Sequence, residues 1–271
     1  MEISGTHISY CDTIIKTERV SEINLPSFDL YEVIRIIDKT PVFLEEHLKR
    51  LNISLKKKKG IYIPEIHLIK NSIHNYLLEL NIVTGNIAIL FSSATSEYII
   101  HALPFKYPTN QEYLHGVKSK TYQVEREFPA IKQINVNESV KHKISHLLEN
   151  KDIYEILLVN RKGNITEGSK SNLFFIRNNK LYTAAESTIL KGITREKILD
   201  CCKNLKIDVS KIKIPLSSIM NYQAAFITGT SAKVLPLNQI DDIAYNSNHI
   251  LIKKIQQEYE SLIQKEVKSH L

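Results

Sequence analysis

Residues 154–184 restrict the fold more than any other stretch, because they predict consecutive strands joined by tight turns. The apolar run at 154–160, YEILLVN, ends at a turn in which Gly163 is suited to a positive φ. A second strand is predicted over residues 165–177, with a polar interruption, and a third returns over 180–184 after two asparagines. Strands in this order form a meander, so this half of the chain is built around a sheet.

The other elements alternate irregularly between strands and helices. Further strands are predicted at residues 31–37, 86–91, 97–103 and 224–228, and helices at 45–58, 66–81, 136–149, 194–205 and 247–265. The strands are grouped into meanders and do not follow a run of βαβ units, which indicates an α+β fold. A length of 271 residues favours two domains. Because the alternation weakens at 106–123, we place the interdomain linker there and predict an N-terminal α/β domain over 1–118 and a C-terminal domain over 119–271.

Composition and charge are those of an ordinary globular protein. Hydrophobic residues make up 43% of the chain and charged residues 24%, and the net charge is +7. The basic excess is spread along the chain except for four lysines at 56–59. No nucleic-acid-binding motif accompanies them, so we interpret this run as a solvated helix end or loop. No stretch reaches 18 apolar residues and the first residues lack a signal-peptide pattern, so we expect a cytoplasmic protein with no membrane or nucleic-acid partner.

The three cysteines do not indicate a metal site or a disulfide framework. Cys11 stands alone, and Cys201 and Cys202 are adjacent in a predicted helix, which is not the spacing of metal ligands. Buried thiols in a helix act as small apolar side chains. We therefore expect no metal.

Three polar segments in the second half interrupt otherwise apolar elements. Residues 166–172, TEGSKSN, place Glu167 within a strongly apolar sheet, where a carboxylate needs a partner such as a protonated ring nitrogen; a polar turn at the surface is the simpler alternative. Gly192 and Thr194 open a helix, and the N–H groups at a helix start bind anions. Residues 228–233, TGTSAK, form a second hydroxyl-rich loop. The two loops could converge on one phosphate, although each is also compatible with an ordinary turn or cap.

Lys132 is the candidate nucleophile. It follows a proline and lies between two isoleucines, which favours burial, and burial lowers the pKa of a lysine so that it can attack carbonyl carbons. A surface position is the commoner fate of a lysine. Lys141 and Lys143 are nearby competitors on a basic helix, and we interpret both as solvated.

The order and spacing of these segments resemble the class IV aminotransferase family. This family comprises the fold-type IV pyridoxal-phosphate enzymes, among them branched-chain and D-amino acid aminotransferases and aminodeoxychorismate lyase. The resemblance extends from about Tyr31 to Pro236. It is carried by YEVIRII (31–37), FLEEHLKRL (43–51), ITEGSKSNLFFI (165–176), LKGITR (190–195) and GTSAKVLP (229–236). It implies a smaller N-terminal α/β domain and a larger C-terminal domain with a mixed sheet or barrel-like core.

The resemblance also implies a role for each matched residue. Lys132 would be the Schiff-base lysine that moves a proton between the substrate Cα and the cofactor, and Glu167 would pair with the pyridinium nitrogen. Asn172 would support the ring or the loop beside Glu167, and Tyr31 would lie on the substrate side. The phosphate of pyridoxal 5'-phosphate would be bound by Arg50, Gly192, Ile193, Thr194, Thr230 and Ser231.

The implied activity is transfer of an amino group between an amino acid and a 2-oxo acid by a homodimer. An aminodeoxychorismate lyase-like elimination of pyruvate on the same scaffold remains open, because both reactions need Lys132 and Glu167. A basic binding protein on a degenerate scaffold is the alternative outside enzymes. The sequence departs from the family in residues 92–97, SSATSE, which lack the arginine and glycine of the usual carboxylate trap. The interval from Lys132 to Glu167 is slightly longer than in the family, and the N-terminus before Tyr31 is short.

Overall fold

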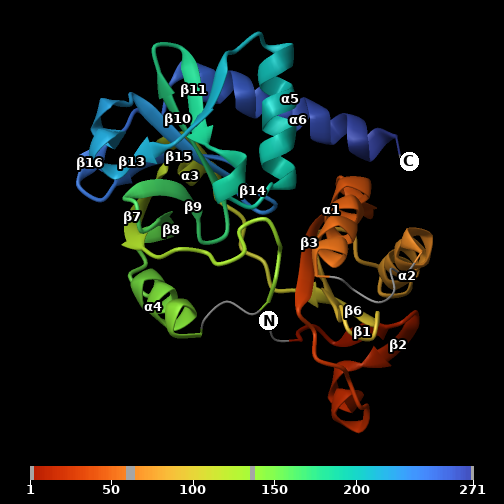
Figure 1. Ribbon diagram of the computed structural model, residues 1–271. Helices are drawn as coiled ribbons and strands as arrows, with labels where there is room; N and C mark the ends of the chain where they lie inside the picture. Colours follow the sequence, from red (N-terminus) through yellow and green to blue (C-terminus); the bar gives the residue numbers. More distant parts are fainter. Residues whose placement is uncertain (1–2, 59–64, 135–137, 270–271) are drawn as a thin grey trace. The chain divides into compact units, whose positions relative to one another are not determined.

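The computed structural model describes residues 3–58, 65–134 and 138–269, and its contacts divide the chain into two compact units (Figure 1). Unit 1 comprises residues 1–106, 131–135 and 263–271, and unit 2 comprises 107–130 and 136–262. The chain therefore leaves unit 1 earlier than the predicted boundary at residue 118. It also returns to unit 1 for a short segment that contains Lys132.

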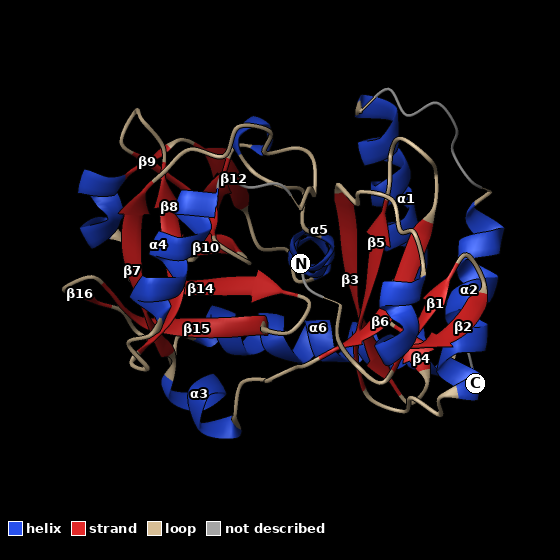
Figure 2. Cartoon of the chain, turned by 90° about the horizontal axis from the view of Figure 1, so that it is seen from below, coloured by secondary structure: helices blue, strands red, loops and turns tan. Residues whose placement is uncertain are grey.

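Unit 1 is an antiparallel sheet with two helices. Its elements are β1 (His7–Tyr10), β2 (Thr13–Lys16), β3 (Leu30–Ile37), β4 (Thr40–Pro41), α1 (Leu44–Lys57), α2 (Ile66–Glu79), β5 (Gly85–Phe91), β6 (Tyr98–Leu103) and a short 3₁₀ helix at Thr17–Glu22. The strand order is β2-β1-β6-β5-β3-β4, and neighbouring strands in this order run antiparallel. Strand β3 alternates buried and half-buried residues, and its buried face packs with leucines and isoleucines of α1 and α2. Figure 2 shows the strands and the two helices of this unit.

Unit 2 is a ten-stranded mixed sheet that curls around its own core. Its strands are β7 (Val117–Gln123), β8 (Ile153–Val159), β9 (Asn164–Gly168), β10 (Asn172–Arg177), β11 (Lys180–Ala184), β12 (Val209–Ile212), β13 (Ile214–Pro215), β14 (Ala224–Gly229), β15 (Lys233–Ile240) and β16 (Ile243–Ala244). The order is β12-β11-β10-β14-β15-β7-β8-β9-β13, with β16 on β15. Contacts of β9 with β10 and β11 close the sheet around one apolar cluster, which matches the expected barrel-like core.

Helices cover the outside of this sheet. They are α3 (Asn110–His115), α4 (Glu138–Leu148), α5 (Ile193–Asn204) and α6 (Ile250–Lys268), with two 3₁₀ helices at Glu186–Thr188 and Leu216–Asn221. Helix α5 packs on β14, α3 on β15 and α4 on β8 (Figures 1 and 2). Cys201 and Cys202 are buried in α5, and burial raises the pKa of each thiol to about 12. Both thiols therefore stay protonated and apolar, as predicted.

Most predicted elements are confirmed within a few residues, including the meander from β8 to β11. The stretch 106–123, where we placed the linker, includes the boundary between the units at 106/107 and also contains α3 and the sheet strand β7. No helix of the described ranges has the length and apolar character needed to cross a membrane. Within the same ranges, no group of three or more histidine, cysteine or acidic side chains is arranged to hold a metal ion.

Candidate active site

Lys132 lies on the edge of β3 in unit 1. Strand β4 pairs with β3 only at Ile36 and Ile37, so the rest of this edge can accept another segment. The N–H of Tyr31 donates to the carbonyl of Lys132 at 3.2 Å, and the N–H of Ile134 donates to the carbonyl of Asp29 at 2.8 Å. The side chain of Lys132 is half-buried, with Nζ 4.5 Å from the centroid of the Tyr31 ring. Main-chain hydrogen bonds thus hold the segment from which the amine extends.

A buried ion cluster links β3 to α1 in the same unit. Glu32 is 0% exposed, and Arg50 donates to both of its oxygens, from Nε at 2.8 Å and from Nη2 at 2.6 Å. His47 Nδ1 lies 2.8 Å from the same carboxylate. Burial raises the pKa of Glu32, but the charge of Arg50 and the two hydrogen-bond partners outweigh it and lower the pKa to about 2. Glu32 is therefore an anion at neutral pH.

His47 is held in its neutral form by its surroundings. Burial lowers the pKa of the imidazole most, and the charges of Arg50 and Lys132 lower it further, although Glu32 acts in the opposite direction. Its Nδ1 donates to Glu32, because an ionised carboxylate can only accept.

The loop that departs from the family pattern is held by an acidic residue. Asp29 accepts hydrogen bonds from the N–H of Ser93 at 2.8 Å and from its hydroxyl at 2.7 Å. Lys58, one of the four clustered lysines, forms an ion pair with Asp29 at 3.2 Å. Burial raises the pKa of Asp29, but these hydrogen bonds and the lysine lower it overall. The charge of Lys58 is therefore paired with the carboxylate of Asp29 in the same chain.

Glu167 is the centre of a second group of residues, which belongs to unit 2. The side chain lies at the end of β9 and is 3% exposed. Its Oε2 accepts a hydrogen bond from the N–H of Leu190 at 3.0 Å and one from Asn172 Nδ2 at 3.3 Å. Asn172 Nδ2 also donates to the carbonyl of Leu190 at 2.9 Å. These bonds tie Glu167 to the segment that leads into α5.

The first turn of α5 lies directly after this network. Gly192 is its N-cap, and no side chain caps the helix. A Cβ at Gly192 would come within 2.1 Å of Asn172 Oδ1, so only glycine fits beside the asparagine. Asn172 also pairs in register with Thr228 on β14. The Thr228 hydroxyl is buried and, within the described part of the chain, has no hydrogen-bond partner.

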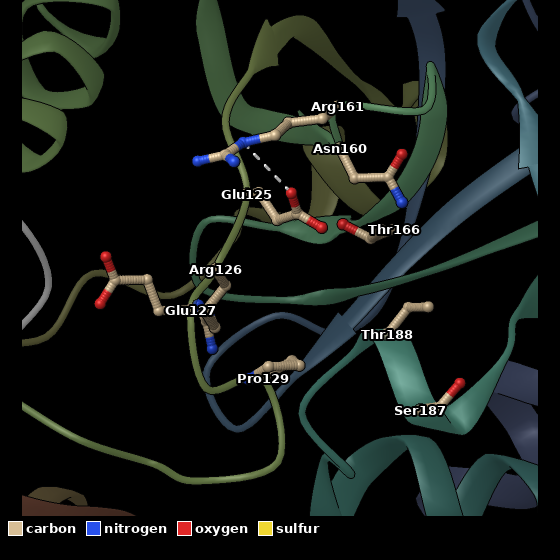
Figure 3. Close-up of a pocket in the computed structure, with 9 residues that line it drawn as sticks. All are labelled: Glu125, Arg126, Glu127, Pro129, Asn160, Arg161, Thr166, Ser187 and Thr188. Atoms are coloured by element: carbon tan, nitrogen blue, oxygen red, sulfur yellow. Dashed lines mark ion pairs between the residues drawn. The ribbon is translucent and has the colours of Figure 1, made fainter.

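Arg126 approaches Glu167 from the segment that follows β7. Its Nε lies 3.4 Å from Glu167 Oε1, and its Nη2 donates to the carbonyl of Ser169 at 3.4 Å. Arg126 also lines a cavity of about 360 Å³, whose rim carries the exposed pair Arg161–Glu125 (Figure 3). Neither the first turn of α5 nor Thr228 is among the residues that line this cavity.

The predicted residues therefore fall into two groups. Tyr31, Arg50 and Lys132 belong to unit 1. Glu167, Asn172, Gly192, Ile193 and Thr194 belong to unit 2, with Thr230 and Ser231 in the turn after β14. The competitors Lys141 and Lys143 are exposed on α4, as predicted. Sequence reasoning missed Glu32, His47 and Arg126. A signal was present for Glu32, because it occupies an inward position of an alternating strand and so needs partners.

A comparison with family models settles what kind of chain this is. The model described as amino-transferase class IV matches residues 29–240. The chain belongs to the class IV aminotransferase family. The resemblance inferred from the motifs is confirmed.

Individual relatives in this family differ in the activity that they are named for. A protein of Rickettsia bellii named "Probable branched-chain-amino-acid aminotransferase" is 32% identical over 113 residues, which are 40% of this chain and 39% of that protein. The D-alanine aminotransferase of Listeria innocua is 25% identical over 230 residues, 79% of this chain and 78% of that protein. The alignments with the branched-chain relatives thus span less than half of those proteins.

Solved structures share the fold over nearly the whole chain. The branched-chain amino acid aminotransferase of Escherichia coli has a TM-score of 0.82 at 22% identity, and the match covers 97% of this chain and 96% of that one. Another branched-chain amino acid aminotransferase, solved as a complex with N-(5'-phosphopyridoxyl)-L-glutamate, has a TM-score of 0.83 at 20% identity. That match covers 98% of this chain and 96% of the other. The predicted α+β, fold-type IV architecture is therefore confirmed.

Proposed function

We propose that this protein is a pyridoxal-phosphate-dependent aminotransferase that moves an amino group between an amino acid and a 2-oxo acid. The observation that carries the proposal is the network of Glu167, Asn172 and Leu190. These hydrogen bonds join a buried carboxylate to the segment that leads into the uncapped N-terminus of α5. The carboxylate suits a protonated ring nitrogen, and the helix N-terminus suits a phosphate. The family membership and the phosphopyridoxyl compound bound by the second solved structure support the same conclusion.

The donors around α5 fit a phosphate ester. The first-turn amides lack a side-chain cap, and a helix N-terminus favours a dianion. Thr194 is 5% exposed in this turn, and the buried Thr228 hydroxyl lies on the adjoining strand with no partner among the described residues. Gly192 keeps the approach open, because any side chain there would displace Asn172. Ile193, Thr230, Ser231 and Arg50 remain predicted phosphate ligands.

Individual residues of the chain would then have separate roles in the reaction. Pyridoxal phosphate supplies an aldehyde carbon and a ring that withdraws electrons from the substrate Cα. Lys132 Nζ would hold the cofactor, release it to the amino substrate, and take and return the Cα proton. Glu167 Oε1 would keep the ring nitrogen protonated. The hydrogen bonds of the 131–134 segment to β3 would fix the position of the Lys132 amine.

An absorbance spectrum and an amino-acid panel test the proposal. The purified protein should carry a visible cofactor band, and borohydride reduction followed by peptide mapping should find the label on Lys132. Lys132→Ala should lose the band, whereas Lys141→Ala, an exposed lysine of α4, should keep it. Transfer of the amino group to 2-oxoglutarate or another oxo acid supports the aminotransferase. Pyruvate release from aminodeoxychorismate without an acceptor would instead support the lyase reaction. A label on another lysine would contradict the role of Lys132.

We further propose that the protein is a cytoplasmic homodimer, as the resemblance implies. Sedimentation should give twice the chain mass of 31.2 kDa at micromolar concentration. A monomer at that concentration would contradict the dimer and leave the proposed reaction untouched. Fractionation of cells that express the tagged protein tests the location.

A further inference from the structure

A buried glutamate lies in unit 2 outside the residues assigned so far. Glu155 is the third residue of β8, in an otherwise apolar run, and is 4% exposed. No ion pair joins it to a cation within the described residues. A carboxylate buried in this way needs several hydrogen-bond donors to replace water. The donors around Glu155 therefore indicate which part of the protein its carboxylate holds in place.

The donors come almost entirely from the four residues between Glu167 and Asn172, here called the 168–171 loop. Oε1 accepts from the hydroxyl of Ser169 at 2.7 Å and, at 3.1 Å, from its N–H, which also donates to the carbonyl of Ile156 at 2.8 Å. Oε2 accepts from the N–H of Lys170 at 3.3 Å and the hydroxyl of Ser171 at 2.7 Å. The remaining donor is the N–H of Ile156, at 2.8 Å from Oε1. Both oxygens are thus occupied by the chain itself.

The packing of this loop leaves little room for another conformation. The N–H of Gly168 donates to the carbonyl of Ser171 at 2.7 Å, which closes the loop. A Cβ at Gly168 would lie 2.1 Å from the Ser171 hydroxyl oxygen and 2.9 Å from the Glu155 carboxylate. The carbonyl of Lys170 packs 3.4 Å from where a Cβ of Gly229 would lie. The loop therefore sits between Glu155 on one side and the end of β14 on the other.

The ends of the loop are the two residues that form the network beside α5. Glu167 precedes it on β9 and Asn172 follows it on β10, and their side chains are hydrogen-bonded to each other. A shift of the loop would move both. Because a misplaced donor or acceptor loses most of its hydrogen-bond energy, small displacements here would weaken the hold on a ring nitrogen.

We propose that Glu155 is a positioning residue for the cofactor site: its carboxylate fixes the 168–171 loop and thereby sets the places of Glu167 and Asn172. The inference rests on the proposed pyridoxal-phosphate function. Glu155 acts through the loop and makes no contact with the reacting atoms, since its oxygens already accept hydrogen bonds from the chain.

The test compares Glu155→Gln with a substitution of another carboxylate in unit 2 that also accepts hydrogen bonds from a main-chain N–H and a hydroxyl. Asp241 accepts from the N–H of Thr121 at 2.9 Å and from its hydroxyl at 2.7 Å, so Asp241→Asn removes a charge from a similar arrangement away from the site. Glu155→Gln keeps the size of the side chain but places an amide nitrogen where one oxygen accepts. Glu155→Asp keeps the charge and shortens the reach. Three quantities are measured: melting temperature without cofactor, amide hydrogen exchange at 169–170, and the Kd of pyridoxal phosphate from absorbance titration.

Glu155→Gln should weaken cofactor binding by at least about tenfold, since hydrogen bonds to a charged group are involved. It should also speed exchange of the amides at 169–170, most strongly at Lys170, because the Ser169 N–H also donates to the carbonyl of Ile156. Asp241→Asn should lower the melting temperature to a similar extent but leave the Kd and these amides unchanged. Glu155→Asp should recover part of the affinity.

Two outcomes would overturn the proposal. One is a Kd for Glu155→Gln equal to that of the wild type, and the other is an equal loss of affinity in Asp241→Asn, which would make the effect one of general stability. Should Glu155→Gln not fold, Ser171→Ala removes a single donor of Oε2 and must weaken binding for the proposal to stand. If the wild-type protein binds no pyridoxal phosphate, the proposed function itself fails, which is a result distinct from those above.

Discussion

Glu32 is a buried charge whose partners are distant from it in sequence. Its partners, His47 and Arg50, are 15 and 18 residues away in sequence, and they reach the carboxylate because they face β3 from successive turns of α1. The pattern of β3 predicts that residue 32 faces inwards. It does not predict which side chains meet it there, because that choice depends on how α1 is placed over the sheet.

Arg50 can be tested for two roles at once, because it pairs with Glu32 and is also the predicted phosphate ligand of unit 1. Arg50→Met leaves a buried carboxylate without its cation and should lower the free energy of unfolding by about 3–5 kcal/mol. The double variant Arg50→Met/Glu32→Gln should recover most of that stability, as measured by urea denaturation. If Arg50 also holds the phosphate, the Kd of pyridoxal phosphate stays weakened in the double variant. Recovery of both quantities would contradict the phosphate role.

The buried cluster of Glu32 and His47 should make stability fall on the acid side. The folded state lowers the pKa of Glu32 to about 2, so its contribution is complete above the ordinary pKa of about 4.5 and is lost as pH falls towards 2. The pKa of His47 is also lowered, so the unfolded state takes up a proton first as pH drops below about 6.5. The free energy of unfolding should therefore decrease from pH 8 to pH 6 and again from pH 6 to pH 5.

His47→Gln isolates the histidine part of this dependence. The variant should show a flatter curve between pH 7 and 5, since glutamine does not titrate, and should keep the loss below pH 4 that belongs to Glu32. His74 on α2 is exposed, so His74→Gln serves as the control and should follow the wild type. An unchanged curve for His47→Gln would show that the imidazole is not held neutral in the folded protein.

Among the residues of the site, those carried by a short motif were predictable and those that meet across elements were not. Glu167, Asn172 and Gly192 lie in two glycine-containing segments that interrupt apolar strands, and the structure joins them in one network. Arg126 and Glu155 gave no local signal. Arg126 lies 43 residues before Ser169, and Glu155 lies 14–16 residues before the serines that it binds, so the local sequence does not show these contacts. Charged residues are also mostly exposed in proteins.

Elements with a strong period were predicted well, and weakly patterned ones were missed. Strand β7 alternates, but two of its inward positions are Ser119 and Thr121, so hydrophobicity does not reveal the alternation. Helix α3 has only six residues, too few for a periodic pattern, although the capping box of Thr109 and Glu112 marks its start. By contrast, Asn178 and Asn179 adopt φ of 51° and 58° in the turn after β10, the left-handed conformation that asparagine tolerates.

The start of α5 gives a prediction at the scale of one element. Gly192 has φ −68° and ψ 137°, which alanine adopts without strain, so Gly192→Ala acts only through the contact of its Cβ with Asn172 Oδ1. Displacing Asn172 should cost about 1–3 kcal/mol of stability and weaken cofactor binding. Gly163→Ala is the matched control, because its added Cβ meets nothing within 4 Å and its cost comes only from a φ of +71°. Equal affinities in the two variants would contradict the proposed phosphate cradle.

At the scale of the whole molecule, the described residues include an apolar cluster in each unit. One is built from β3, β5, β6 and the two helices of unit 1, and the other lies within the curled sheet of unit 2. Each core can unfold with its own melting temperature when nothing couples them. The proposed cofactor ligands include Lys132, which belongs to unit 1, and Glu167, which belongs to unit 2. A cofactor held by both residues would couple the two transitions.

Calorimetry of the protein with and without cofactor measures this coupling. Without pyridoxal phosphate, we expect two overlapping transitions. Loading should merge them into one at higher temperature, with a gain of about 2.7 kcal/mol when the free cofactor is about 100 times its Kd. In Lys132→Ala, any remaining binding would depend on the residues of unit 2, so the cofactor should raise one transition and leave the other in place. If loading of the wild type raises only one transition, the cofactor is held by one unit alone, and Lys132 and Glu167 cannot act on the same molecule.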